Sequence, residues 1–561
     1  MRPFALIACA ALACCAPRIH AEDAAAFDIV ISNGHIIDGT GSPWYSGDVG
    51  IRGGQIAAIG NLAASARART IDAHGMVVAP GFIDMLGQSE LTILVDPRLP
   101  SKIYQGITTE ITGEGGSVAP QNDAVRKAEA HDCEHVRISC DWSTFREYFA
   151  RLEKQGMGIN LASFVGATQV RKVVLGFDDV QPDAAQLDQM RQLVREAMRD
   201  GAVGVSTSLE YPPAPYAKTD EIIALAAEAA PYGGIYATHM RSEGDAIMAS
   251  LDETFRIGRE AHVPVEIWHL KVAGKENWGR MGDVIARINA ARAEGLDVSA
   301  DTYAYTAWSN DLSAFIPPWA HDGGKDKLVA RLKDPATRAR IRHDLLTPST
   351  SWDNEWNEIS GPQDVMITSV LNPELVKFQG KRLTDIAAAW HEDPMDALFD
   401  FLVADHAYAY CAVFGMSEPD VSLALQQPWV AINNDSEGAS PEGLLGQEHP
   451  HPRAYGTFPR ILRKYVREEH KLTLEDAIRK FSALPAQRMR LTDRGVLREH
   501  MWADVVVFDP ATIRDLATYD NPNQLSQGMA YVLVNGKLVI DGGAMTGQLP
   551  GKVLRGAGYQ P

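Results

Sequence analysis

The chain has 561 residues, of which 45% are hydrophobic and 22% are charged, which is the composition of an ordinary globular protein. This length exceeds what one simple core needs, and it suits a large barrel with a smaller second domain. The net charge of −19, without a local basic patch, argues against nucleic-acid binding, which depends on Lys and Arg at the phosphates. The composition therefore favours a small molecule as the partner.

The first 21 residues are predicted to be a secretory signal peptide. A positive charge at position 2 precedes an apolar run over residues 4–16, and Ala21 is the expected cleavage site. The run is too short to span a bilayer, and no later segment has 18 uncharged apolar residues. We therefore expect an exported protein, periplasmic or extracellular, without a membrane span. Cys14 and Cys15 leave lipid anchoring of a cysteine open as an alternative.

Three cysteines remain once the predicted signal peptide is removed. Cys133 and Cys140 lie in the polar stretch "HDCEHVRISCDW", and export would allow them to form a loop disulfide. The alternative is a Cys/His metal site that also uses His131 and His135, although the spacing matches no zinc-finger pattern well. Cys411 begins the apolar run "CAVFGM" and is expected to be a small buried residue.

The two ends of the chain carry similar short strands. Residues 28–41 ("DIVISNGHIIDGTG") and 531–543 ("YVLVNGKLVIDGG") each hold β-branched residues around an Asn-Gly pair, which predicts a hairpin. The stretches "DVGIRGGQIAAIG" and "WADVVVFDP" predict further strands. We therefore expect residues 27–80 and 492–550 to form one small β-sandwich, with the middle of the chain as a large insert.

In the middle of the chain, strands and helices alternate. The helix "DAAQLDQMRQLVREAMRDG" has Asp183 as its cap and Gly201 as its stop, and "AVGVSTS" follows as a strand. Similar units continue to "DVSADTY", and strands that return through a helix must be parallel. This α/β pattern predicts a (β/α)8 barrel over residues 81–491, with a doubly wound sheet as the alternative. Residues 313–375 interrupt the rhythm and predict an insertion above the barrel mouth.

Two histidines stand at the ends of predicted barrel strands. His239 ends "GGIYATH" and His269 ends "VPVEIWH", so both are expected at the carboxyl-end mouth, where barrel enzymes keep their sites. Neutral imidazoles on neighbouring strands suit a zinc-like ion. The alternative is that each histidine has its own structural partner. His262 lies at the entry of its strand and is expected to be structural.

Two carboxylates are candidates for the same site. Asp435 ends the apolar run "PWVAINND", and a carboxylate near a metal ion can take a proton from water. Its alternative role is to form a turn after Asn-Asn. Glu114 lies in "QGITTEITGEGGSVAP", where flanking glycines allow the backbone a close approach. It is either a metal ligand or part of a glycine-rich turn.

Long phrases occur in order along residues 28 to 550. They are "APGFID", "QGITTEITGEGGSVAP", "GAVGVSTSLEYPPAPYA", "ATHMRSEGD", "EIWHLKVAGKENWG", "HPRAYGTFPRIL" and "RGVLREHMWADVVVFDP". With these phrases the chain resembles the N-acyl-D-amino-acid deacylases (D-aminoacylases) of the amidohydrolase superfamily. The resemblance implies a metal-dependent barrel with a small β-sandwich, and hydrolysis of the amide bond of N-acyl-D-amino acids.

The resemblance also implies roles for individual residues. His239 and His269 match two ligands of a tightly held zinc ion, and Asp435 matches the aspartate that acts as general base and then acid. The groups that match those holding the substrate carboxylate are Lys271, Tyr303 and Ser309. Arg453 in "HPRAYG" either helps there or is a packing cation. Cations and hydroxyls facing a carboxylate make charge-assisted bonds that also orient the substrate.

The chain departs from the family pattern at two places. After Gly-Phe-Ile-Asp the family normally has His-x-His, two ligands of a second metal, but here "PGFIDMLGQSE" carries Leu86 and Gln88. Where the family has a bridging cysteine in "GNCG", this chain reads "GEGG", so Glu114 or Gly115 takes that place. We therefore predict one divalent ion, zinc, held by Glu114, His239 and His269 with a position open to water.

Two other functions remain open from the sequence. The loss of His-x-His favours a secreted, non-catalytic relative that binds acylated amino acids or peptides, whereas the retained histidines, Lys271 and Asp435 disfavour it. A third possibility keeps the hydrolytic chemistry but acts on a cyclic amide or an N-acyl-dipeptide. Metal content and a panel of substrates distinguish these functions.

Overall fold

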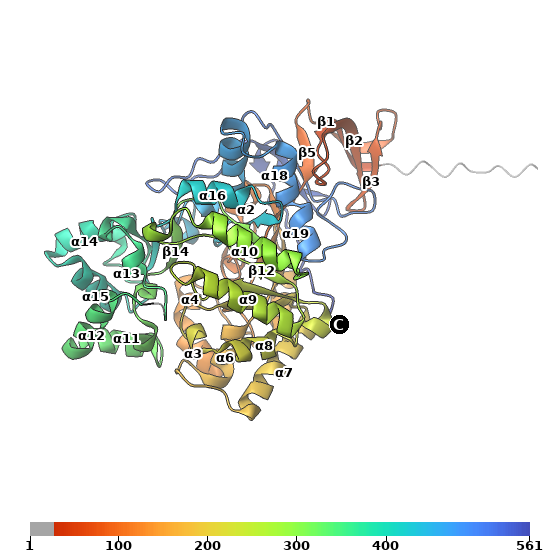
Figure 1. Ribbon diagram of the computed structural model, residues 1–561. Helices are drawn as coiled ribbons and strands as arrows, with labels where there is room; N and C mark the ends of the chain where they lie inside the picture. The colour runs from red at the N-terminus through yellow and green to blue at the C-terminus, as the bar shows by residue number, and fades with distance from the viewer. Residues whose placement is uncertain (1–26, 350) are drawn as a thin grey trace, which may run out of the picture.

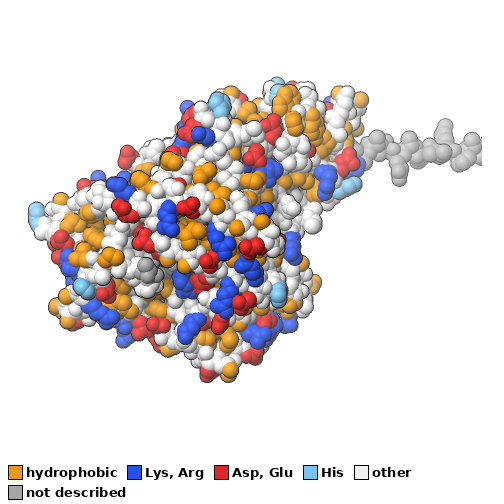
Figure 2. Space-filling view, viewed as in Figure 1, with side chains coloured by type: hydrophobic (Ala, Val, Ile, Leu, Met, Phe, Trp, Pro, Cys, Tyr) orange, Lys and Arg blue, Asp and Glu red, His pale blue; other side chains and the backbone are white. Residues whose placement is uncertain are grey.

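The structure is a computed structural model that describes residues 27–349 and 351–561 (Figure 1). The predicted signal peptide, including Cys14 and Cys15, lies outside the described residues. Among the described helices, none is both long and apolar enough to cross a membrane. On the face shown in Figure 2, basic and acidic side chains are interspersed with hydrophobic ones.

The small domain is built from both ends of the chain, as predicted. Its nine-stranded sheet has the order β21-β20-β19-β18-β5-β1-β2-β3, with β4 paired to β1. The strands are β1 (Phe27–Ile36), β2 (Tyr45–Arg52), β3 (Gln55–Gly60), β4 (Arg67–Asp72), β5 (Val77–Pro80), β18 (Val505–Phe508), β19 (Met529–Val534), β20 (Lys537–Asp541) and β21 (Ala544–Met545). A separate core of aliphatic side chains, including Ile31, Val49, Val505 and Leu533, joins the strands from the two ends. Red and blue strands accordingly meet in Figure 1.

Only one of the two Asn-Gly pairs forms the predicted hairpin. Asn535 and Gly536 both have positive φ and connect β19 to β20, as a two-residue I′ turn requires. The hairpin predicted at Asn33-Gly34 is wrong. There only Asn33 has positive φ, and the pair forms a bulge inside β1, where the pairing with β2 shifts between Ile31 and Gly34.

The large domain is the predicted (β/α)8 barrel of parallel strands. The strands are β6 (Phe82–Asp84), β7 (Ile107–Thr112), β8 (Asn160–Ser163) continued by β9 (Val165–Gly166), β10 (Gly204–Ser208), β11 (Ile235–His239), β12 (Val265–Ile267), β13 (Val298–Thr302) and β17 (Val430–Ile432). The amide of Met85 donates to the carbonyl of Ile432 at 3.3 Å, which closes the barrel between β6 and β17. The carboxyl ends of all these strands therefore meet at one mouth.

Helices surround the barrel (Figure 1). Helix α7 begins after Asp183, whose side chain accepts from the amide of Gln186, and ends at Gly201 with φ of 116°. Both ends thus agree with the predicted cap and stop. The longer helices packed outside the barrel are α5 (Phe145–Gln155), α6 (Ala167–Leu175), α7 (Ala184–Asp200), α8 (Thr219–Ala226), α9 (Ile247–Ala261), α10 (Met281–Ala293), α16 (Glu418–Leu425), α17 (Arg453–Arg460) and α18 (Leu474–Phe481).

The insertion is larger than the predicted 313–375. Strands β14 (Trp308–Asp311), β15 (Val365–Ser369) and β16 (Tyr410–Val413) form an antiparallel sheet in the order β14-β16-β15. The central strand is the last in sequence, so the segment cannot end before residue 413. Its helices are α11 (Lys325–Lys333), α12 (Pro335–Leu345), α13 (Glu355–Glu358), α14 (Leu383–Trp390) and α15 (Pro394–Ala404). They form the green lobe beside the barrel in Figure 1.

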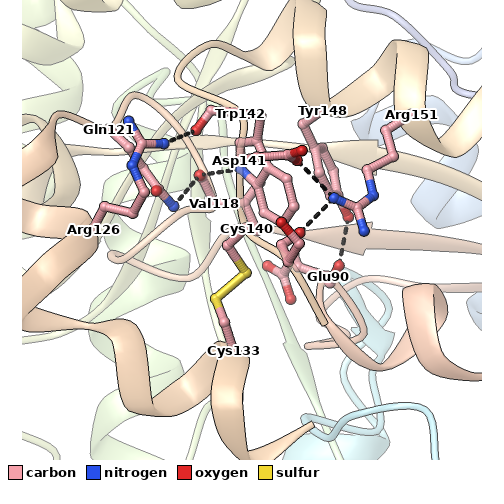
Figure 3. Close-up of a disulfide and its surroundings, with 11 residues drawn as sticks. Glu90, Val118, Gln121, Arg126, Cys133, Cys140, Asp141, Trp142, Tyr148 and Arg151 are labelled. Carbon is pink, nitrogen blue, oxygen red and sulfur yellow. Dashed lines mark hydrogen bonds and ion pairs between the residues drawn. A yellow bond between two sulfur atoms is a disulfide. The ribbon is translucent and has the colours of Figure 1, made fainter. Parts of the chain in front are cut away.

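The loop after β7 is closed by a disulfide between Cys133 and Cys140, with an S–S distance of 1.98 Å (Figure 3). The predicted disulfide is confirmed, and the alternative Cys/His metal site is wrong because both sulfur atoms are bonded to each other. The neighbouring Trp142 donates its indole N–H to the carbonyl of Val118 at 2.8 Å. Cys411 is fully buried, as predicted.

Candidate metal centre and active site

The three predicted ligands follow three barrel strands. His239 is the last residue of β11, His269 lies two residues after β12, and Glu114 lies two residues after β7. Gly113 and Gly115, on either side of Glu114, have φ of 94° and 60°. A Cβ on Gly115 would lie 2.4 Å from the Cβ of Ser208, so the turn that aims Glu114 at the histidines requires glycine.

The three side chains present a compact triangle of donor atoms. His239 Nδ1 lies 3.0 Å from His269 Nε2, and Glu114 Oε1 lies 3.3 Å and 3.2 Å from these two nitrogens. Zinc bonds of about 2.0–2.1 Å in tetrahedral geometry separate ligand atoms by about 3.3 Å. The triangle therefore fits one tetrahedral ion, and the three ligands leave a fourth position for another group.

Two further carboxylates hold the imidazole rings from behind. His239 Nε2 lies 2.7 Å from Glu210 Oε2, and His269 Nδ1 lies 3.1 Å from Glu243 Oε1. A carboxylate that accepts the second ring N–H fixes the tautomer and orientation of a metal-binding histidine. Glu210, His239 and Glu243 also form a second close group of ligand atoms, which shares the His239 ring with the first. We interpret Glu210 and Glu243 as supports of the two histidines.

Sequence reasoning missed Glu210 and Glu243, although a signal was present. Glu210 lies two residues after β10, and Glu243 lies four residues after the end of β11. Both therefore occupy the carboxyl-end loops of barrel strands, the place from which the histidines were selected. Applying the same criterion to acidic residues would have found them.

The carboxylates attract protons to the histidines. Burial lowers the pKa of His239, but Glu243, Glu114 and Glu210 outweigh burial and raise it to about 10. Burial likewise raises the pKa of Glu114, but hydrogen bonds with His239 and His269 hold it well below its usual value. Because a metal ion binds the deprotonated donors, protons and metal compete for this site.

Asp435 follows β17 and is held on three sides. Its amide donates to the carbonyl of Leu86 at 2.9 Å, and its φ of 47° is unusual for a residue with a side chain. Its Oδ2 forms an ion pair with Arg453 Nη1 at 2.7 Å, and its Oδ1 accepts from Gln88 Nε2 at 3.0 Å. Burial raises the pKa of Asp435, and the Arg453 cation opposes this rise. The tight turn thus directs a buried carboxylate toward Gln88 and Arg453.

The fixed place of Asp435 depends on a buried lysine that sequence reasoning also missed. Lys102 is fully buried, and its Nζ lies 2.9 Å from Asp84 Oδ2 and 3.2 Å from Glu110 Oε1. It also donates to Asn434 Oδ1 and to the carbonyl of Ser436, each at 2.8 Å. One cation thus joins β6 and β7 to both neighbours of Asp435.

The residues predicted to hold a substrate carboxylate differ in their surroundings. Lys271 forms an ion pair with Glu243 and lies 2.8 Å from His269 Nδ1. Tyr303 is fully buried, and the Arg453 guanidinium lies over its ring at 4.8 Å. The hydroxyl of Ser309 donates to a backbone carbonyl at 2.8 Å, whereas its own carbonyl accepts from Arg453. Lys271 thus contacts the ligand His269 and Arg453 contacts Asp435, whereas Tyr303 and the backbone of Ser309 contact Arg453.

The insertion adds an acidic wall, which we define as Asp353, Glu355 and Glu358. All three are buried, and Asp353 Oδ2 accepts from the amides of Glu243 and Gly244 at 2.7 and 3.2 Å. Asp353 lines a cavity of about 40 Å³ whose other lining residues include Glu210 and Trp352. Burial and the nearby Glu210 raise the pKa of Asp353 to about 7. The surroundings of the ligand group are therefore rich in carboxylates.

Comparisons with known proteins agree with this geometry. A family described as "Amidohydrolase family" matches residues 445–540. D-aminoacylase of Alcaligenes xylosoxydans xylosoxydans is 37% identical over 536 residues, which are 95% of this chain and 98% of that protein. N-acyl-D-glutamate deacylase from Bordetella bronchiseptica, solved with zinc and a phosphonate mimic of the tetrahedral intermediate, is 34% identical with a TM-score of 0.79. That comparison covers 95% of this chain and 100% of the solved chain.

A further solved structure concerns the binuclear metal centre of D-aminoacylase, described as having one-metal activation and second-metal attenuation. It is 35% identical to this chain with a TM-score of 0.79, and the comparison covers 94% of this chain and 100% of the other. Relatives of this similarity span nearly the full length of the chain, and the barrel and the sandwich match the expected architecture. The chain belongs to the N-acyl-D-amino-acid deacylase (D-aminoacylase) family of the amidohydrolase superfamily.

Proposed function

We propose that this protein hydrolyses the amide bond of N-acyl-D-amino acids, releasing a carboxylate and a free D-amino acid. The proposed cofactor is one divalent ion, zinc, held by Glu114, His239 and His269. The observation that carries the proposal is the triangle of donor atoms 3.0–3.3 Å apart at the barrel mouth. The deacylase names of the relatives and the phosphonate complex of one of them support the reaction class.

The residues around the triangle supply the other parts of an amide hydrolase. When bound, a divalent ion would polarise the acyl carbonyl and lower the pKa of a water molecule. Asp435 is the buried carboxylate that takes the proton of the attacking water and later gives it to the leaving amine. Glu210 and Glu243 keep the ring nitrogens of His239 and His269 oriented toward the ion.

The substrate carboxylate is proposed to bind near Arg453, Lys271 and Tyr303. In the structure Arg453 is paired with Asp435, so a substrate carboxylate offers Arg453 a second anion. Sharing the guanidinium weakens its hold on Asp435 and leaves that carboxylate more basic. Binding of the correct substrate would then prepare the proton acceptor. The backbone carbonyl of Ser309, which accepts from Arg453 at 3.2 Å, keeps the guanidinium in place.

The variant Asp435→Asn tests the mechanism directly. We expect turnover to fall by about 10³-fold or more, because the amide cannot accept the proton of water. Zinc content is expected to stay the same, because Asp435 is outside the ligand triangle. Asp283→Asn, at an exposed position in α10, is the matched control. Retained activity in Asp435→Asn would remove this residue from the mechanism.

A hydrolysis screen of N-acetyl D- and L-amino acids, with and without added zinc, tests the substrate class. We expect zinc-dependent release of D-amino acids. A purified protein with less than about 0.2 ion per chain, and no hydrolysis after zinc is added, would instead indicate the non-catalytic binder. Cyclic amides and N-acyl-dipeptides belong in the same panel, because they test the other hydrolytic substrates.

The acidic wall predicts the side chain that the substrate carries. Burial and the neighbouring carboxylates, Glu210 among them, raise the pKa of Asp353 to about 7 and the pKa of Glu355 and Glu358 well above the usual value, so this region disfavours a further negative charge such as a second carboxylate on the substrate. We therefore propose that neutral or cationic D-amino acids are preferred over acidic ones. The relatives named for N-acyl-D-glutamate and N-acyl-D-aspartate are thus not expected to share the side-chain preference of this chain.

We also propose that the protein is exported after cleavage at Ala21, to the periplasm or beyond. The disulfide between Cys133 and Cys140 supports an oxidising compartment, because glutathione keeps cytosolic thiols reduced. Cell fractionation and mass determination of the mature N-terminus test this proposal. A lipid-anchored form beginning at Cys14 or Cys15 would appear as a heavier, membrane-associated species, and a cytosolic full-length chain would contradict export.

A further inference from the structure

The side chain of Gln88 lies where two carboxylates face each other. Its Nε2 is 2.8 Å from Glu114 Oε2 and 3.0 Å from Asp435 Oδ1. The backbone fixes this position, because the amide of Gln88 donates to the carbonyl of Ser436 at 3.1 Å and the amide of Gly87 donates to that of Ile111 at 2.8 Å. The loop after β6 is thus hydrogen-bonded to β7 on one side and to the segment after β17 on the other.

The side-chain amide carries two protons on one nitrogen. One N–H donates to Glu114 and the other donates to Asp435. The N–H₂ group therefore lies between two carboxylates, where a metal cation would otherwise offset their charge. The amide nitrogen has no free electron pair to offer a metal ion. Leu86, at the other position of the expected His-x-His pair, is fully buried and has no donor atom. The residues present therefore do not fit a second metal ion.

We propose that Gln88 is a positioning residue that takes the place of the second metal ion and keeps the centre mononuclear. Its side-chain amide donates to Glu114 Oε2, so only Oε1 of Glu114 faces the two histidine nitrogens. It also holds Asp435 Oδ1 while Arg453 holds Oδ2, so the proton acceptor is fixed without a second cation. Attenuation by a second metal, which is described for a relative, would be absent from this chain.

The first experiment measures zinc stoichiometry and activity together. The wild-type protein and the double variant Leu86→His with Gln88→His are titrated with zinc, and bound ions are counted after removal of free metal. We expect about one ion per chain in the wild type and about two in the double variant, because His-x-His restores two imidazole donors. Excess zinc should leave wild-type activity unchanged and lower that of the double variant.

The second experiment removes only the donors. Gln88→Met keeps the length of the side chain but lacks the amide, so Asp435 and Glu114 lose their shared partner. We expect kcat to fall by about 10- to 100-fold with an unchanged KM and one bound ion, because a misplaced catalytic group slows the chemical step. Gln192→Met, at an exposed position in α7, is the matched control and should behave as wild type.

This inference rests on the proposed function, but the two can fail separately. Two zinc ions in the wild type, attenuation of the wild type by excess zinc, or an unchanged kcat in Gln88→Met would overturn the role of Gln88. One bound ion in the wild type without hydrolysis of any N-acyl amino acid would overturn the proposed reaction instead. In that outcome the stoichiometry of the double variant still tests the exclusion of the second ion.

Discussion

The two sides of the barrel mouth differ in how their buried charged groups are paired. On the side of β11 and β12, His239 and His269 are backed by the carboxylates Glu210 and Glu243, and nitrogen donors remain for a metal ion. On the side of β6, β7 and β17, carboxylates face the mouth and hydrogen-bond donors hold them, with Gln88 between Glu114 and Asp435. On the proposed function, the first side binds a metal cation. On the second side, the hydrogen-bond donors of Gln88 take the place of a second cation.

On the proposed function, this difference shows how a metal site can be kept after one ligand pair is lost. Removing His-x-His alone would leave Glu114 Oε2 and Asp435 Oδ1 facing each other without a donor between them, and a buried charged oxygen without a hydrogen-bond partner is costly. Gln88 supplies donors at that place, and Lys102 supplies a buried cation beneath it. On the proposed mechanism, the proton-acceptor side is therefore stabilised by side chains of the protein in place of a second ion.

The largest expected effect comes from breaking the metal-binding side. His269→Ala removes one corner of the donor triangle, so we expect zinc content to fall well below one ion per chain and activity to fall by about 10³-fold or more. Metal analysis of the purified variant with a hydrolysis assay checks this. His262→Ala, at the residue that caps the carboxyl end of α9 before β12, is the control and should keep its zinc. A His269→Ala protein with full zinc content would contradict the assigned ligand.

The next effect concerns the fold on the opposite side. Lys102→Met leaves Asp84 and Glu110 buried without their cation, so we expect the free energy of unfolding to fall by about 3–5 kcal/mol. Chemical denaturation followed by circular dichroism measures this change. Lys154→Met, on the exposed face of α5, is the matched control. A loss no larger than that of the control would show that Lys102 does not hold the barrel seam.

A smaller effect sharpens the role of the supporting carboxylates. Glu210→Gln keeps a hydrogen-bond acceptor for His239 but removes its charge. We expect zinc affinity to fall by about 10- to 100-fold, as is typical when a carboxylate behind a metal-binding histidine is changed. Competition with a chelator measures the affinity. Glu253→Gln, which pairs with Arg241 on the outer side, serves as the control, and equal affinities in both variants would argue against the support role.

The smallest effect, when it is counted for a single pH unit, is the pH dependence of metal binding. The pKa of His239 in the metal-free site is raised to about 10, so the ring holds a proton at neutral pH and must release it to bind zinc. Apparent zinc affinity should therefore rise by about tenfold for each pH unit between roughly 6 and 9. Chelator competition at several pH values measures this slope. An affinity independent of pH would show that His239 is already neutral.

Much of the fold could be predicted because local patterns and chain order determine it. The cap at Asp183, the stop at Gly201 and the alternation of strand and helix were sufficient to predict the parallel barrel. The insertion could not be bounded in the same way. Its central strand β16 comes last in sequence and pairs with two strands far behind it, and such long-range pairing leaves no local signal.

The candidate site shows the same division between local and long-range information. The sequence by itself placed His239 and His269 at the carboxyl ends of barrel strands, and the family resemblance added Glu114 and Asp435 to the same mouth. Only the tertiary structure decided that Gln88 lies between two carboxylates and that Lys102 joins β6 and β7 to the segment after β17. Those contacts join residues up to 347 positions apart, and their electrostatic value exists only once burial removes the competing water.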